Sequence, residues 1–146
     1  MKPTRAYTDG NFGQIHYCTL GEGAPLVLMH QSPTCMVQFD KVWQLLADRG
    51  YRVIGIDLPG FGGSDGPQDV PVIGDYAHIV PAVLDDLGID KADILGHHTG
   101  AIVATEAVLQ SSKQIPLIVD TGQPQAHPDD RIRRPTTEGE DITSSM

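Results

Sequence analysis

Short apolar runs alternate along the chain with segments whose apolar residues recur every three or four positions. Continuous apolar runs predict strands that are buried on both faces of a sheet. Strands are predicted at residues 12–20, 25–29, 51–56, 92–95 and 115–119. Helices are predicted at residues 37–49, 76–87 and 100–110. This alternation favours the α/β class, as a three-layer α/β/α sandwich with a mostly parallel sheet.

Glycine and proline mark the limits of these elements. Gly50 and Gly88 follow the first two predicted helices and are expected to end them. Pro81 lies inside the second helix, where it should kink the early turns or move the start later. Residues 57–74 are rich in glycine and proline and predict a long loop.

The character of the chain changes after Asp120. Residues 1–120 are predicted to form one domain, whereas residues 121–146 carry only scattered apolar residues among prolines, charges and hydroxyls. Such a segment buries too little apolar surface to offset the entropy that ordering costs. We therefore expect residues 121–146 to be a polar, disordered tail.

Composition and charge exclude several classes of function. The chain has 146 residues, with 19 acidic and 10 basic side chains and a formal charge of −9. No basic stripe is present to neutralise phosphates, so we expect neither nucleic acid nor an anionic membrane as partner. The sequence shows no signal peptide or membrane-spanning run, and two cysteines are too few for a disulfide framework. A cytoplasmic protein is the expectation.

The segment Gly96-His97-His98-Thr99-Gly100 is the most informative motif. It lies between the predicted strand 92–95 and an alanine-rich helix. Strand, sharp turn and helix are the setting of the G-x-S-x-G nucleophile elbow, in which small flanking residues let the strand and the helix approach. The centre of that motif is expected to be Ser, Cys or Asp, but here it is His98.

Two further segments carry a family resemblance together with this turn. Residues 25–33, Pro-Leu-Val-Leu-Met-His-Gln-Ser-Pro, resemble a strand followed by a His-Gly-x-Pro oxyanion loop. Residues 57–65, Asp-Leu-Pro-Gly-Phe-Gly-Gly-Ser-Asp, resemble a D-x-P-G-x-G-x-S-D loop. In this order, the three motifs resemble the N-terminal half of an α/β-hydrolase-fold protein, from the group of haloalkane dehalogenases, epoxide hydrolases and esterases. The resemblance covers about residues 12–120 and implies a truncated, partial domain.

The resemblance implies roles for several residues. It assigns oxyanion-hole or substrate contacts to His30, Gln31 and Thr99, with the backbone N–H groups of Gln31 and Thr99 as donors. Gln31 stands where the family loop usually has glycine, so its side chain would intrude on the pocket. The alternative is that residues 30–33 form only a strand-to-helix turn. The loop at residues 57–65 is expected to be mainly structural, with Ser64 or Asp65 bonded to backbone.

His98 has three possible roles. It could be a nucleophile, a general acid/base or polarising group, or a residue without covalent role that fills the pocket or binds a ligand. A helix N-terminus disfavours the imidazolium form, which suits a neutral imidazole. Thr99 is a weaker candidate for the nucleophile, and His97 is expected to pack in the turn.

The family's catalytic triad continues with an acid and a histidine from later loops. Asp120, at the end of the predicted strand 115–119, is the candidate orienting carboxylate, and His127 in the polar tail is a weak candidate base. Because the family's sheet continues further, the strand 115–119 is expected to present an unpaired edge that favours self-association. His30, His97, His98 and His127 lack the usual spacings of metal ligands, so no metal and no cofactor is expected.

The sequence leaves several functions open. The first is a hydrolase acting on an ester, an epoxide or a carbon–halogen bond, with a small-molecule substrate and His98 in place of the usual nucleophile. The alternatives are a non-catalytic relative that binds a small molecule or a partner, and an inactive truncated product. We expect the isolated chain to be weak or inactive as an enzyme.

Overall fold

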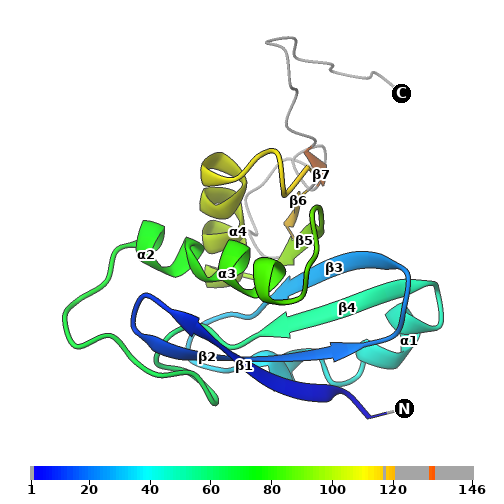
Figure 1. The fold of residues 1–146 in the computed structure, drawn as a ribbon, viewed down its shortest axis with the longest axis horizontal. Helices are drawn as coiled ribbons and strands as arrows, with labels where there is room; N and C mark the ends of the chain where they lie inside the picture. Colours follow the sequence, from blue (N-terminus) through cyan, green and yellow to red (C-terminus); the bar gives the residue numbers. More distant parts are fainter. Residues whose placement is uncertain (1, 117, 121–131, 134–146) are drawn as a thin grey trace, which may run out of the picture.

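The computed structural model describes residues 2–116, 118–120 and 132–133 of the chain. Its strands form one seven-stranded sheet in the order β1-β2-β4-β3-β5-β6-β7 (Figure 1). The strands are β1 (Thr4–Gly10), β2 (Gly13–Leu20), β3 (Ala24–Met29), β4 (Tyr51–Ile56), β5 (Asp93–Gly96), β6 (Ile118–Asp120) and β7 (Ile132–Arg133). The helices are the short 3-10 helix η1 (Met36–Phe39), then α1 (Trp43–Ala47), α2 (Ile73–Ala77), α3 (Ile79–Asp86) and α4 (Thr99–Gln110).

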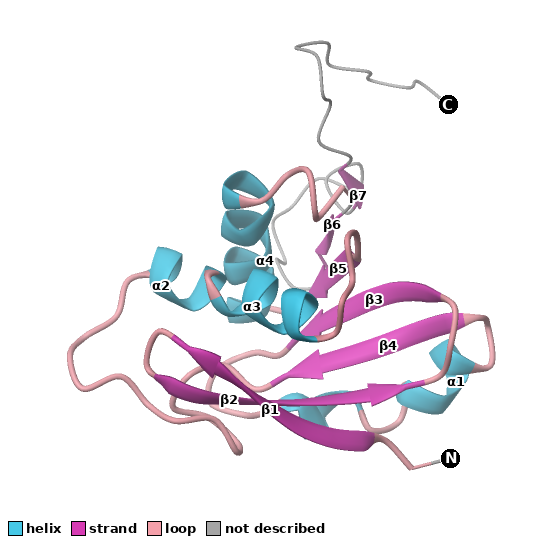
Figure 2. Cartoon of the chain, viewed as in Figure 1, coloured by secondary structure: helices cyan, strands magenta, loops and turns pink. Residues whose placement is uncertain are grey.

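The sheet is parallel at its centre and antiparallel at both sides. Strands β4, β3, β5 and β6 pair in parallel. The N-terminal hairpin of β1 and β2 pairs antiparallel with β4, and β7 pairs antiparallel with β6. Figure 2 shows this hairpin as a long twisted ribbon, on the side of the sheet away from β5, β6 and β7. The parallel centre brings the carboxyl ends of β3, β4, β5 and β6 to one edge.

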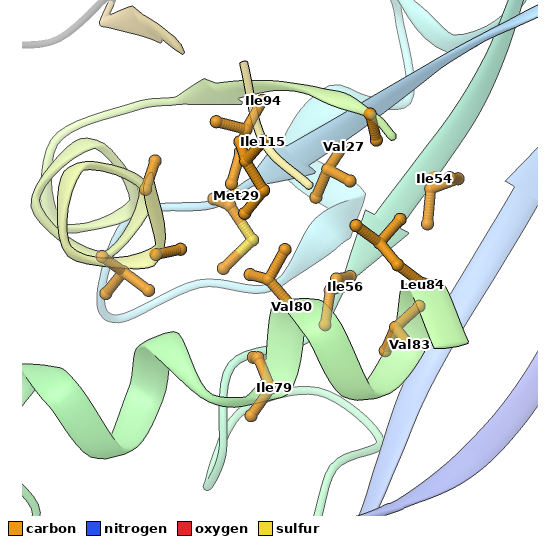
Figure 3. Packing of buried hydrophobic residues seen from close by; sticks show 14 of the residues in the cluster. Val27, Met29, Ile54, Ile56, Ile79, Val80, Val83, Leu84, Ile94 and Ile115 are labelled. Carbon is orange, nitrogen blue, oxygen red and sulfur yellow. The ribbon is translucent and has the colours of Figure 1, made fainter. Parts of the chain in front are cut away.

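Two hydrophobic cores cover the two faces of the sheet. Alternate residues of β3 divide between them: Val27 and Met29 belong to one core, and Leu26 and Leu28 to the other. The first core packs against α3 and α4, and Figure 3 draws part of it. The second packs against η1 and α1, where Trp43 is its largest side chain. The predicted α/β/α layers are therefore confirmed.

The helices differ in detail from the sequence prediction. The predicted helix 37–49 is divided into η1 and α1. The predicted helix 76–87 starts earlier and is divided at His78, which separates α2 from α3. Pro81 is accommodated without ending α3 because it lies in the first turn, where a backbone N–H has no acceptor within the helix. Gly50 and Gly88, at φ of 88° and 64°, take the left-handed backbone that ends a helix.

The last strand corrects another expectation. β6 begins at Ile118 rather than at Ile115, which is fully buried in the first core before the strand starts. β6 is not an unpaired edge, because β7 lies beside it, with Val119 opposite Ile132. Apart from this two-residue strand, the segment 121–146 lies outside the described residues, as does His127.

Candidate active site at the carboxyl edge of the sheet

A sharp turn joins β5 to α4 at the centre of the carboxyl edge. β5 ends at Gly96 and α4 begins at Thr99, so two residues reverse the chain. His98 has φ of 51° and ψ of −117°. Among the residues that the structure describes, it is the only non-glycine residue with positive φ. Such a backbone costs about 1–3 kcal/mol and persists where the surrounding structure holds it in place.

Close packing of the helix against the strands holds this turn. A Cβ atom on Gly96 would overlap the backbone of Ala101, and one on Gly100 would overlap the carbonyl groups of Met29 and His30. The backbone N–H of His97 donates to the carbonyl of Met29 at 3.1 Å. The glycines expected from the motif are therefore required by contact distances. The turn is fixed against the end of β3.

His98 is exposed, while His97 and Thr99 are half-buried. The rings of His97 and His98 meet edge to face, with centroids 4.6 Å apart and planes at 89°. The imidazole of His98 caps no backbone group at the start of α4. It is thus open to solvent at the edge where the parallel strands end.

His30 is buried and acts within the fold. Its side chain is fully inaccessible. Nδ1 donates to the carbonyl of Gln31 at 2.7 Å, and Nε2 accepts the backbone N–H of Leu58 at 2.9 Å. Burial lowers the pKa of His30, which keeps this ring neutral and able to accept that bond. The expected contact of its side chain with substrate is not available in this geometry, and His30 instead joins two loops.

Of the two expected oxyanion donors, the backbone N–H of Gln31 is already hydrogen-bonded and, among the described residues, that of Thr99 is not. The backbone N–H of Gln31 donates to Oε1 of Gln38 at 3.0 Å, so this donor is already occupied. Within the described part of the chain, no acceptor lies within hydrogen-bond distance of the backbone N–H of Thr99 or of Ser32. Ser32 follows Gln31 in the same loop and is exposed. Neither Ser32 nor Gln38 was expected from the sequence, because the bond to Gln38 spans seven residues and no local pattern predicts it.

Asp120 reaches the same edge through the sheet register. Its Cα lies opposite that of Gly96 on the neighbouring parallel strand. The backbone therefore places Asp120 one strand away from the start of the His98 turn.

The loop after β4 is a structural network centred on Asp57, which is 2% exposed. The carboxylate accepts the backbone N–H groups of Met36 and Gly63 at 2.8 and 2.9 Å, and it bonds Nδ1 of His16 at 2.8 Å. The Ser64 hydroxyl donates to the carbonyl of Asp57 at 2.7 Å. The hydrogen bond to backbone that was expected of Ser64 is confirmed.

His16 was missed by the sequence analysis, because its partner Asp57 lies 41 residues away. A weak signal was present. His16 and Cys18 stand on one face of β2, whose other face carries the buried Ile15 and Tyr17. Buried polar side chains are usually hydrogen-bonded, so a histidine on a half-buried strand face indicates a polar partner.

Comparison with known proteins now defines the class. Residues 24–133 match the family described as alpha/beta hydrolase fold. The chain belongs to this family.

Relatives add detail. The chain is 32% identical over 133 residues to a 2-hydroxy-6-oxononadienedioate/2-hydroxy-6-oxononatrienedioate hydrolase of Burkholderia vietnamiensis, with 88% of this chain and 46% of the relative covered. It is 30% identical over 126 residues to epoxide hydrolase A of Mycobacterium tuberculosis, with coverages of 84% and 39%. The chain thus spans less than half the length of these relatives.

A solved structure supports the fold. An epoxide hydrolase from an endophytic Streptomyces superposes with a TM-score of 0.77 at 24% identity, over 85% of this chain and 38% of that one.

Among the described residues, no group of three His, Cys, Asp or Glu side chains could hold a metal ion. In the same residues, no helix has the length and apolar character to cross a bilayer.

Proposed function

We propose that the protein is a hydrolase-like member of its family. It acts on a small molecule with an ester, epoxide or carbon–halogen bond at the carboxyl edge of the sheet. The observation that carries this proposal is the backbone of His98, whose positive φ sets an exposed imidazole on a turn held by Gly96 and Gly100. Strained backbone is concentrated at functional sites because a fold retains it where the position of a side chain matters.

The proposed chemistry uses the imidazole of His98 as a general base. It accepts a proton from water while the water oxygen attacks the electrophilic carbon of the substrate. The bond from that carbon to the leaving oxygen or halogen breaks, and the imidazolium gives its proton to the leaving oxygen or, with a halide, to solvent. The free backbone N–H of Thr99 donates to the atom on which negative charge develops, the oxygen of an ester or epoxide or the leaving halide. Asp120 is the proposed orienting carboxylate, on the strength of its register opposite Gly96. A direct attack by the imidazole is the covalent variant of the same proposal.

A second candidate function is binding without turnover. It is favoured by the bond between Gln38 and the N–H of Gln31, which removes one of the two expected oxyanion donors. Loss of one such donor lowers kcat by about 10²–10³-fold. We therefore expect the isolated chain to be a weak catalyst. A small-molecule partner and a cytoplasmic location remain predictions.

The test is hydrolysis of a panel of nitrophenyl esters, styrene-type epoxides and short haloalkanes by the wild type, H98A, H98S and the matched control H97A. Turnover that is abolished in H98A and retained in H97A supports the hydrolase. Turnover that arises only in H98S, with saturable binding in the wild type, identifies a binding relative. Equal turnover in the wild type and H98A would overturn the proposed role of His98.

A further inference from the structure

A second polar cluster lies away from the His98 turn, in a cavity of about 890 Å³. The cavity is lined by the N-terminal hairpin, η1, α1 and the loop after β4, and its lining residues include none of the turn at residues 96–100. His16, Asp57 and both cysteines of the chain contribute to this lining. The proposed hydrolase site uses none of them.

The hydrogen bond to Asp57 fixes the orientation of the His16 ring. A carboxylate only accepts hydrogen bonds, so the nitrogen that lies 2.8 Å from Oδ2 of Asp57, Nδ1, carries the proton. Asp57 is itself held by two backbone N–H groups, those of Met36 and Gly63. The ring is therefore held with Nε2 on the side away from Asp57, and in the neutral imidazole this Nε2 is the nitrogen that can accept a proton.

Cys18 lies beside this nitrogen. It stands two residues after His16 on the same face of β2, and its Sγ is 3.8 Å from Nε2. This distance suits a thiol that donates to nitrogen. The register of the hairpin places Arg5 opposite Cys18 and Tyr7 opposite His16, and the Tyr7 and His16 rings lie 5.0 Å apart. Thiol, imidazole and carboxylate thus follow one another in the order that nucleophilic catalysis requires.

We propose that Cys18, His16 and Asp57 form a second nucleophilic site, which takes small activated acyl compounds such as aryl esters or thioesters. The Sγ–H proton passes to Nε2 of His16 as sulfur forms a bond to the acyl carbon. The bond from that carbon to the leaving oxygen or sulfur breaks, and His16 returns the proton to the leaving group. Water then attacks the thioester on Cys18, giving one proton to His16, and the C–S bond breaks as sulfur takes that proton back.

The surroundings of the Cys18 thiol indicate that it needs a base to remove its proton. Cys18 is 6% exposed, and burial raises the pKa of its thiol. The positive charge of Arg5 lowers that pKa, whereas the negative charges of Asp57 and Asp40 raise it further. The thiol therefore stays protonated at rest and depends on His16 to remove its proton. Cys35 lines the same cavity and is half-buried, but among the described residues no imidazole lies within hydrogen-bond distance of its sulfur. It is a matched internal control.

The first experiment needs no variant. The folded chain is treated with a small nitrophenyl ester, and acyl groups on the two cysteines are quantified over time by mass spectrometry. We expect Cys18 to be acylated faster than Cys35 although it is less exposed, and the two to react alike after denaturation. A native rate at Cys18 that is no faster than that at Cys35 would overturn the proposal.

The second experiment removes the base alone. H16N in a C35S background keeps a side-chain amide that can donate to Asp57 but lacks Nε2. We expect acylation of Cys18 to slow by about 100-fold, the usual contribution of a general base, with a thermal midpoint that confirms folding. Folded H16N that reacts at the rate of the C35S parent would refute a base role for His16. If H16N does not fold, the comparison of the two cysteines decides.

Discussion

At residue 98, backbone and side chain contribute separately to the site. The positive φ comes from contacts of Gly96 and Gly100 with neighbouring backbone, whereas the chemistry comes from the imidazole that the turn exposes. The glycines could be predicted from the sequence because only glycine permits so close an approach of helix and strand. Whether the N–H of Gln31 is free for a substrate could not be predicted, because this depends on where the side chain of Gln38 lies in three dimensions.

The bond from Gln31 to Gln38 gives a prediction at this scale. Q38L keeps the approximate volume of the side chain but removes the acceptor, which frees the N–H of Gln31 for a substrate oxygen. If the hydrolase proposal holds, kcat/KM for a nitrophenyl ester should rise by up to about 10²-fold.

Q110L is the control, because Gln110 bonds Glu106 on the exposed side of α4. It should leave kcat/KM unchanged. An unaltered kcat/KM in Q38L would show that the N–H of Gln31 has no part in the reaction.

At the scale of elements, strands and helices are joined by a few closely fitted contacts. Gly55 of β4 lies against the indole of Trp43 in α1, where a Cβ atom would approach the ring to 2.5 Å. On the other face, the Tyr17 hydroxyl of β2 donates to Asp86 of α3 at 2.6 Å. These contacts join α1 to β4 and α3 to the neighbouring β2, on opposite faces of the sheet.

G55A should destabilise the protein, because a well-packed core accepts an added methyl group only by shifting its neighbours. The expected loss is about 1–3 kcal/mol of unfolding free energy in urea denaturation. The double variant G55A/W43L should lose less stability than the sum of the two single losses, since leucine lacks the far edge of the indole. Additive losses in the two single variants would contradict a direct clash between residues 43 and 55.

The Tyr17 contact predicts loss of stability at high pH. Burial, with the bond to Asp86, raises the pKa of Tyr17 to about 12, above its ordinary value of 10.0. The folded state therefore holds this proton more tightly than the unfolded chain. The resulting stability is complete below pH 10 and is lost as the pH rises through about 12. Y17F should weaken this decline in thermal midpoint between pH 9 and 12, and an identical decline would exclude Tyr17 as its source.

Strands β2, β3, β4 and β5 were predicted to within one residue at each end, whereas β1 and β7 were not predicted. β3 and β4 are continuous apolar runs, so their bounds could be predicted to within one residue. β1 has the sequence Thr-Arg-Ala-Tyr-Thr-Asp-Gly and is largely exposed, and it is a strand because β2 pairs with it along its whole length. The two-residue β7 likewise follows from pairing with β6. Local sequence contains no information on such pairing partners.

At the scale of the whole molecule, one sheet carries two candidate sites. The carboxyl edge of the parallel strands bears His98, and the hairpin side bears His16 and Cys18 in the separate cavity. The formal charge of −9 favours solubility through repulsion between copies. In the described part of the chain, β7 pairs with β6 over two residues, and we keep this side of the sheet as the place where self-association is expected.

Self-association can be tested by light scattering after size exclusion at increasing concentration. The wild type should show a growing share of species above 15.7 kDa. I132P removes a backbone donor from β7 and so weakens its pairing with β6. The variant should form these larger species at lower protein concentration than the wild type. A single monomer peak at all concentrations in both proteins would contradict the prediction.

The imidazole of His30 couples two loops of the fold. One nitrogen is tied to Gln31 and the other to Leu58, so a single rigid ring spans the segments that follow β3 and β4. A ligand that displaces the first segment must therefore pull on the second or break one of these two bonds. Occupancy at the His98 edge should then be visible as altered amide exchange at Leu58, far along the chain from any residue that the ligand contacts.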